Sequence, residues 1–94
     1  MIPKYKLIYT NSFKRDLKKI EKRGYNISLL DEVVTMLQCG KTLDPKYNDH
    51  PLKGDKLGFR DCHIQNDWVL LYQIKEDKLI LSLSRTGTHS DLDL

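Results

Sequence analysis

The amino-acid sequence predicts an α+β fold, in which a mostly antiparallel four-stranded sheet carries an N-terminal helical hairpin on one face. Three observations lead to this prediction. Apolar residues recur at helical spacing in two early segments, three later segments have the composition of strands, and the turns between those strands are too short for crossover helices. The length of 94 residues suits a single domain, residues 1–94, with one modest core.

The chain is predicted to begin with a strand that leads into a helix. Residues 5–9 are rich in aromatic and branched side chains, which favour strands. Residues 10–12 are Thr, Asn and Ser, the residue types that cap helix N-termini. The apolar face of the helix that follows is formed by Phe13, Leu17 and Ile20, and Gly24 is suited to end it.

A second helix is predicted directly after the first. Ser28 and Asp31 have the spacing of a capping box, which places the helix start at Ser28. Gly40 is predicted to end this helix. Its apolar face is formed by Leu30, Val33, Val34 and Leu37. Because the connection between the two helices is short, we expect them to form an antiparallel hairpin.

Residues 41–56 are predicted to form a loop, because they are polar, aperiodic and contain two prolines. A loop of this length in so small a domain suggests a functional role. Residues 57–64, 68–75 and 79–85 are then predicted to form an antiparallel meander of strands. The aromatic residues of these strands, Phe59, Trp68 and Tyr72, are expected in the core, and the alternative is that they form platforms on which RNA bases stack.

Composition excludes several classes of protein. With 39% hydrophobic and 31% charged residues, the chain is too apolar to be disordered and too charged for a membrane protein. No apolar run reaches the roughly 18–20 residues of a membrane-spanning helix, and the first residues lack the apolar segment of a secretory signal. Cys39 and Cys62 do not form a disulfide framework. We therefore expect a reduced, cytoplasmic protein.

Positive charge is concentrated near the N-terminus. Eight of the sixteen basic residues lie between Lys4 and Arg23, where only two acidic residues oppose them. Such a stripe favours a polyanion or an acidic protein partner, although a solvated helix face has the same pattern. The basic residues of the predicted first helix are Lys14, Arg15, Lys18, Lys19, Lys22 and Arg23.

All three histidines lie among polar residues in the second half of the chain. The alternation of side chains along a strand places Asp61 and His63 on one face, and it places Cys62 on the other, which argues against a cysteine nucleophile. A concave sheet, with the long loop folded over it, would gather one polar cluster. Its members would be His50, Asp61, His63, Asp67, Arg85 and His89.

Such a cluster has the groups that metal-independent RNA cleavage requires. Two histidines in different environments can act as base and acid, a carboxylate can orient an imidazole, and an arginine can neutralise charge on the phosphate. Alternatively, each histidine is structural, Asp61 is an ion-pair partner of Arg60 or Arg85, or the cluster binds zinc. Neither an H-x-x-E-H nor an H-E-x-x-H spacing is present, so no metal site is predicted.

Four motifs resemble the YafQ branch of the RelE-like toxins, which belong to bacterial type II toxin–antitoxin systems. Asp49–Gly54 reads D-H-P-L-K-G, and Gly58–Ile64 reads G-F-R-D-C-H-I. Asp67–Tyr72 reads D-W-V-L-L-Y, and Arg85–His89 reads R-T-G-T-H. The resemblance covers nearly the whole chain, including the helical hairpin.

The resemblance implies a RelE-like fold, cleavage of mRNA in the ribosomal A site without a metal or other cofactor, and silencing by a cognate antitoxin. Arg85 would contact phosphate, and the basic first helix would bind ribosomal or messenger RNA. The catalytic set implied by the family is His50, Asp61, His63, Asp67 and His89. Two alternatives are a catalytically inactive RNA- or antitoxin-binding module and a small metal-dependent hydrolase.

This chain departs from the family at one position. The YafQ branch usually has an aromatic residue four positions after the last histidine, where this chain has Asp93. An aromatic ring there could stack on a base of the substrate. Its loss bears on efficiency or codon preference but removes no group that transfers protons.

Overall fold

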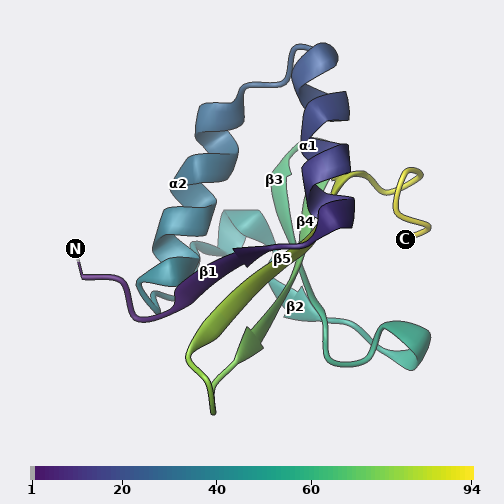
Figure 1. Cartoon of the computed structure of the whole chain (residues 1–94). Coiled ribbons are helices and arrows are strands. Elements are labelled where there is room, and N and C mark those ends of the chain that lie inside the picture. Colours follow the sequence, from purple (N-terminus) through teal and green to yellow (C-terminus); the bar gives the residue numbers. More distant parts are fainter. Residues whose placement is uncertain (1) are drawn as a thin grey trace.

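The computed structural model describes residues 2–94 and has the expected α+β class, with two helices and a mixed sheet (Figure 1). Two short 3-10 turns, Pro45–Tyr47 and Gly54–Lys56, lie between the helices and the main strands. The other elements in chain order are β1 (Lys6–Tyr9), α1 (Asn11–Lys22), α2 (Ile27–Gln38), β2 (His50–Pro51), β3 (Arg60–Gln65), β4 (Trp68–Lys75) and β5 (Ile80–Thr88).

The sheet has five strands in the order β1-β5-β4-β3-β2, so the prediction of four strands is wrong. The additional strand, β2, comes from the predicted loop and pairs antiparallel with β3, opposite Asp61 and Arg60. A two-residue strand containing proline leaves no periodic signal in a sequence. The loop therefore extends the edge of the sheet instead of folding over it. At the opposite edge, β1 runs parallel to β5, which makes the sheet mixed.

The first helix begins as expected, whereas the second begins earlier. Thr10 caps α1 by accepting a hydrogen bond from the Phe13 backbone N–H at 3.0 Å. The N-cap of α2 is Asn26, whose side-chain oxygen accepts a hydrogen bond from the Ser28 backbone N–H at 3.2 Å. The predicted capping box that starts at Ser28 is therefore wrong, because Asn26 already supplies the acceptor.

Two strand boundaries also differ from the prediction. The strand predicted at residues 57–64 begins only at Arg60, because the preceding segment forms a 3-10 turn and Gly58 has a φ of +94°. The last strand starts after Leu79, whose φ of +51° belongs to the turn, and continues to Thr88. This extension brings the residue before His89 into the sheet.

Both helices lie over the same face of the sheet (Figure 1). Phe13, Ile20 and Val33 of the helices form one core with Tyr72 and Leu83 of the sheet. Trp68 and Tyr72 are buried there, as expected, whereas Phe59 is only half-buried and lies outside this core. No helix within residues 2–94 has the length and apolar character to cross a membrane.

Candidate active site

Asp61 lies at the centre of the polar cluster, on the sheet face opposite the helices. Its side chain is almost fully buried, and within the described residues its Oδ1 atom has no hydrogen-bond partner. His50 is opposite Asp61 in the β2–β3 register, and its Nε2 lies 4.0 Å from Asp61 Oδ2. His63 follows two residues later on β3, and its Nε2 lies 4.0 Å from Asp61 Oδ1. One carboxylate therefore faces two imidazoles.

The third imidazole comes from the segment after β5. The His63 and His89 ring centroids lie 5.0 Å apart, with the rings inclined at 75°. Asp67, in the turn before β4, accepts hydrogen bonds from His89 Nδ1 and from the His89 backbone N–H. This carboxylate fixes the orientation of the His89 ring and leaves Nε2 free to exchange a proton.

The two carboxylates have opposite pKa shifts. Burial raises the pKa of Asp61, because its ionised form has lost water, although the nearby imidazoles partly oppose this shift. The hydrogen bond from His89 lowers the pKa of Asp67. Burial also raises the pKa of the Cys62 thiol, so this cysteine stays protonated and is no nucleophile.

A hydrogen-bonded network holds the segment that carries His50. Tyr72, buried in the core, donates its hydroxyl to Asp49 Oδ1 at 2.5 Å, and Arg60 donates to both Asp49 oxygens at 3.3 Å. His50 Nδ1 lies 2.7 Å from the Asn48 carbonyl oxygen. Because a carbonyl can only accept, Nδ1 is the protonated nitrogen, and the lone pair of neutral His50 lies on Nε2, which faces Asp61.

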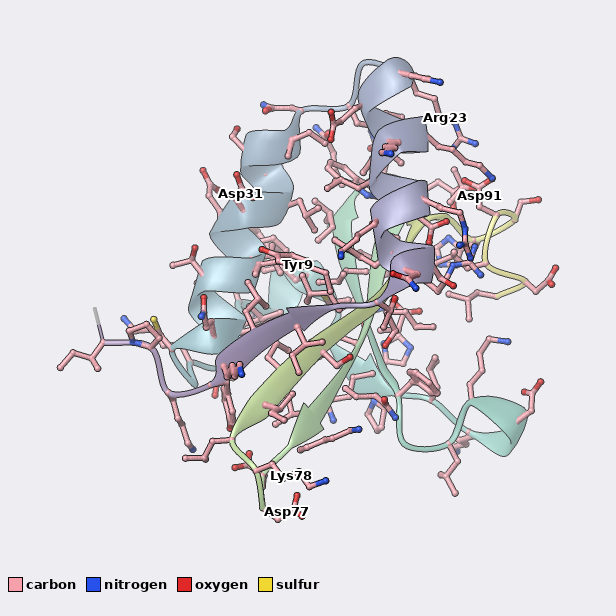
Figure 2. All side chains as sticks on the ribbon, viewed as in Figure 1. Tyr9, Arg23, Asp31, Asp77, Lys78 and Asp91 are labelled. Carbon is pink, nitrogen blue, oxygen red and sulfur yellow. The ribbon has the colours of Figure 1, made fainter. Side chains whose placement is uncertain are left out.

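An ion pair holds the segment that carries His89. Arg23, just after α1, donates to both carboxylate oxygens of Asp91, at 2.6 and 3.2 Å, and Figure 2 shows the two side chains meeting. Asp91 Oδ2 also accepts a hydrogen bond from the Thr88 backbone N–H at 3.0 Å. A Cβ atom at Gly87 would lie 2.9 Å from the same oxygen, so this close turn requires glycine. The Arg23 guanidinium holds the pKa of Asp91 well below its usual range.

Arg85 reaches the sheet face beside Asp61 but is bound by a carboxylate from α1. Its Nε and Nη2 atoms donate to the two oxygens of buried Asp16, at 2.6 and 3.1 Å. Asp16 also accepts a hydrogen bond from the Thr86 backbone N–H at 3.1 Å. The alternative that Asp61 pairs with Arg60 or Arg85 is therefore wrong, because Asp49 and Asp16 bind those arginines.

The remaining basic residues predicted to bind RNA lie exposed along α1. Arg23 differs from them, because its guanidinium is bound to Asp91. Arg15 donates a hydrogen bond to the Ser12 hydroxyl at 3.3 Å. The lysines of this exposed row are Lys14, Lys18, Lys19 and Lys22.

The fold brings together most of the residues predicted from the sequence. His50, Asp61, His63 and His89 form one group, and Asp67 joins it through His89. Asp93, which stands in place of the family's usual aromatic residue, is exposed and has a φ of +55°. Beside it, Leu92 is buried.

Sequence reasoning missed the acidic residues that hold this group in place: Asp16, Asp49 and Asp91. For Asp49 and Asp91 there was a signal, since each lies within two residues of a histidine.

Sequence reasoning also missed a candidate group of metal ligands that come from separate segments of the chain. One donor atom each from Asp61, His63 and His89 lies within 4.8 Å of the others. Such a group has no local spacing motif.

Comparison with known proteins shows the same family over almost the whole chain. The family described as the bacterial toxin of type II toxin–antitoxin system, YafQ, matches residues 5–94. The mRNA interferase toxin YafQ of Escherichia coli K12 is 39% identical over 85 residues, which cover 89% of this chain and 90% of the relative. The putative toxin YafQ of Haemophilus influenzae is 38% identical and covers 95% of this chain and 92% of the relative.

Solved structures agree with this result. The E. coli DinJ–YafQ toxin–antitoxin complex matches with a TM-score of 0.86 at 33% identity, over 95% of this chain and 97% of that one. A copper-bound mutant toxin from Helicobacter pylori matches with a TM-score of 0.89 at 41% identity, over 94% of this chain and 98% of that one. This chain therefore belongs to the YafQ family of bacterial toxins of type II toxin–antitoxin systems.

Proposed function

We propose that this protein is the toxin of a type II toxin–antitoxin pair and that it cleaves mRNA on the ribosome without a metal. Membership of the YafQ family and the mRNA interferase named among its relatives support the activity. The observation that carries the mechanism is the buried Asp61 carboxylate, which His50 and His63 both face, with His89 in ring contact with His63.

The reaction transfers a phosphoryl group within the RNA. The 2′-oxygen attacks the adjacent phosphorus, the bond from phosphorus to the 5′-oxygen breaks, and the products are a 2′,3′-cyclic phosphate and a 5′-hydroxyl. His50 is the proposed base, because its Nε2 lone pair faces the site. His89 is the proposed acid: when its ring is protonated, Asp67 accepts from Nδ1–H and the second donor, Nε2–H, can protonate the leaving oxygen.

Asp61 and His63 would support these two proton transfers. As His50 accepts a proton, the buried carboxylate stabilises the imidazolium that forms. His63 lies between Asp61 and His89 and would contact the phosphate from this position. Arg85, fixed by Asp16, would contact a phosphate oxygen with the part of its guanidinium that remains exposed. The lysines of α1 would bind RNA phosphates at longer range.

The proposed partner is a cognate antitoxin. A solved relative from E. coli is the toxin of the DinJ–YafQ complex, and its fold covers 95% of this chain. An antitoxin bound to this chain would block either the His50–Asp61–His89 group or the basic face of α1. Both surfaces are used in the proposed contact with the ribosome.

The proposed function is tested by expressing the chain alone in a bacterium. We expect growth arrest and mRNA cut within translated regions, whereas co-expression of the cognate antitoxin restores growth. His89→Ala is the matched control and should be harmless at equal protein level. Normal growth with intact transcripts and folded wild-type protein would instead support the inactive binding module.

A transition-metal ion is a second ligand that this site can hold. Imidazole and carboxylate are suitable donors, and three of them lie within 4.8 Å of one another. One structural relative, the H. pylori mutant toxin, is copper-bound. A metal here would bind the nitrogens that the mechanism needs for proton transfer. We therefore expect added copper or zinc to inhibit cleavage and EDTA to leave purified toxin active; loss of cleavage in EDTA would favour a metal-dependent hydrolase.

A further inference from the structure

The open face of the sheet contains a cavity beside the proposed catalytic group. The β3–β4–β5 register places Asp61, Leu71 and Arg85 in one row across the sheet. Leu71 and Arg85 also line a cavity of about 360 Å³, which extends from that row towards the Gln73–Ser82 pair. His63 lies beyond the row on the other side, opposite Val69. The cavity therefore continues the site away from His63.

The walls of this cavity suit a flat, polar-edged molecule. Phe59 and Leu71 supply apolar surface, and Phe59 is only half-buried. Gln73, Ser82 and Ser84 supply an amide and two hydroxyls, and none of these side chains makes a hydrogen bond within residues 2–94 of the structure. An amide offers donors and an acceptor at once, and a hydroxyl can rotate to do either. These groups are available to read the edge of a base.

The charge at the rim matches a nucleotide chain. Lys56 and Arg85 both line the cavity, and both are partly exposed. Cations beside an apolar floor are typical of surfaces that bind single-stranded RNA, where phosphates meet the cations and bases stack on aromatic rings. The size also fits, because pockets for small ligands measure roughly 300–1,000 Å³.

We propose that this cavity binds one base of the mRNA next to the scissile phosphate, that Gln73 reads its edge and that Phe59 stacks on it. The proposal rests on the proposed function, because it assumes that the phosphate lies at the His50–Asp61–His89 group. It assigns codon preference to the sheet surface and not to the C-terminal segment, where Asp93 stands in place of the family's usual aromatic residue.

The test compares Gln73→Ala with Gln65→Ala, a matched control on exposed β3 surface outside the cavity. Two measurements are made for each protein. The first is single-turnover cleavage on ribosomes programmed with messages that carry each of the four bases beside the cleaved bond. The second is the affinity for four single-stranded RNA oligonucleotides that differ at the same base.

We expect wild type and Gln65→Ala to prefer one base, and Gln73→Ala to reduce that preference about tenfold in both measurements, since a good amide–base contact is worth about that factor. Phe59→Leu should weaken binding of all four oligonucleotides about equally, by roughly tenfold, and leave their ranking unchanged. An unchanged ranking in Gln73→Ala would overturn the subsite.

The two proposals fail differently. If ribosomal cleavage persists with the same base ranking in Gln73→Ala, the subsite is wrong and the proposed function stands. A different result would separate the two proposals in the other direction. If wild type binds the four oligonucleotides with different affinities, Gln73→Ala removes those differences, and wild type cleaves no message, then the subsite stands and the proposed function is wrong.

Discussion

The segments that carry His50 and His89 bring their rings to the same place but are held by different interactions. The His50 segment is held at Asp49 by the buried Tyr72 hydroxyl and by Arg60, and β2 adds strand pairing with β3. The His89 segment is held by an ion pair between Arg23 and Asp91 that lies in solvent.

This difference predicts which segment responds to its environment. Hydrogen bonds to a charged group in a partly buried setting contribute about 1.5–3 kcal/mol, whereas exposed ion pairs contribute about 0–1 kcal/mol and weaken with salt. The His50 segment should therefore be rigid under most conditions. The His89 segment should loosen as ionic strength rises.

The largest expected effect tests whether both segments serve one reaction. His50→Ala and His89→Ala should each reduce cleavage by about 10²-fold or more, the typical contribution of an acid–base group. The double variant should be only slightly worse than the poorer single variant, because one loss already disables a unit. The measurement is single-turnover cleavage on programmed ribosomes, with circular dichroism as the control for folding. Fully additive losses would show two independent roles.

The next effect concerns the segment that carries His50. Tyr72→Phe removes one hydroxyl from Asp49 and should lower the free energy of unfolding by about 1.5–3 kcal/mol. The loss should be almost independent of salt. Urea denaturation measures it, and Tyr9→Phe is the matched control, because Tyr9 is exposed. Equal losses in the two variants would mean that the Asp49 network does not hold this segment.

The buried carboxylate between the two segments should cost stability at neutral pH. Burial raises the pKa of Asp61 in the folded state. As pH rises above the ordinary carboxyl pKa of 3.8, Asp61 therefore loses its proton in the unfolded state before it does so in the folded state. Stability from this group is therefore greatest at low pH and falls as pH rises through the folded-state pKa. Asp61→Asn should unfold at a higher temperature than wild type at pH 7, and this advantage should shrink towards pH 4.

The same variant should cleave poorly, because it cannot stabilise an imidazolium. Thermal unfolding followed by circular dichroism at several pH values tests the stability, and cleavage at pH 7 tests the activity. A variant that is less stable at pH 7 and equally active would contradict both parts of this prediction.

The smallest expected effect concerns the segment that carries His89. Asp91→Asn should reduce cleavage by no more than about fivefold at low salt, because an exposed pair contributes about 1 kcal/mol or less. The difference in cleavage rate between Asp91→Asn and wild type should disappear near about 0.5 M salt, because screening has by then weakened the Arg23–Asp91 pair in wild type as well. Single-turnover cleavage on programmed ribosomes at rising salt measures this. Asp77→Asn, at the tip of the β4–β5 turn far from Arg23 in Figure 2, should behave as wild type throughout.

Local patterns predicted the parts of the fold that depend on neighbours in sequence. Both helices were predicted by apolar spacing, and the alternation along β3 placed Asp61 and His63 on one face. The histidine group was predicted because its members stand in recognisable motifs. The two-residue strand β2 was not predicted, because it forms only by pairing with β3.

The interactions that hold the site could not be predicted from local patterns. Arg23 and Asp91 are 68 residues apart in the chain, and Asp16 and Arg85 are 69 apart. A buried aspartate in the middle of a basic helix gives no sign that it binds the last strand. For the same reason, Arg23 was grouped with the RNA-binding residues of α1, although its guanidinium is bound to Asp91.

The position of β5 in the sheet also determines when the protein can become active during its own synthesis. β5 lies between β1 and β4, and α1 is attached to it through Asp16. It is nevertheless the last strand that the translating ribosome produces. Until residues 80–88 have emerged, β1 has no neighbour and the His89 segment does not exist. Because pairings between distant segments form late, a nascent chain with this topology cannot assemble the site that would cleave the mRNA from which it is being translated.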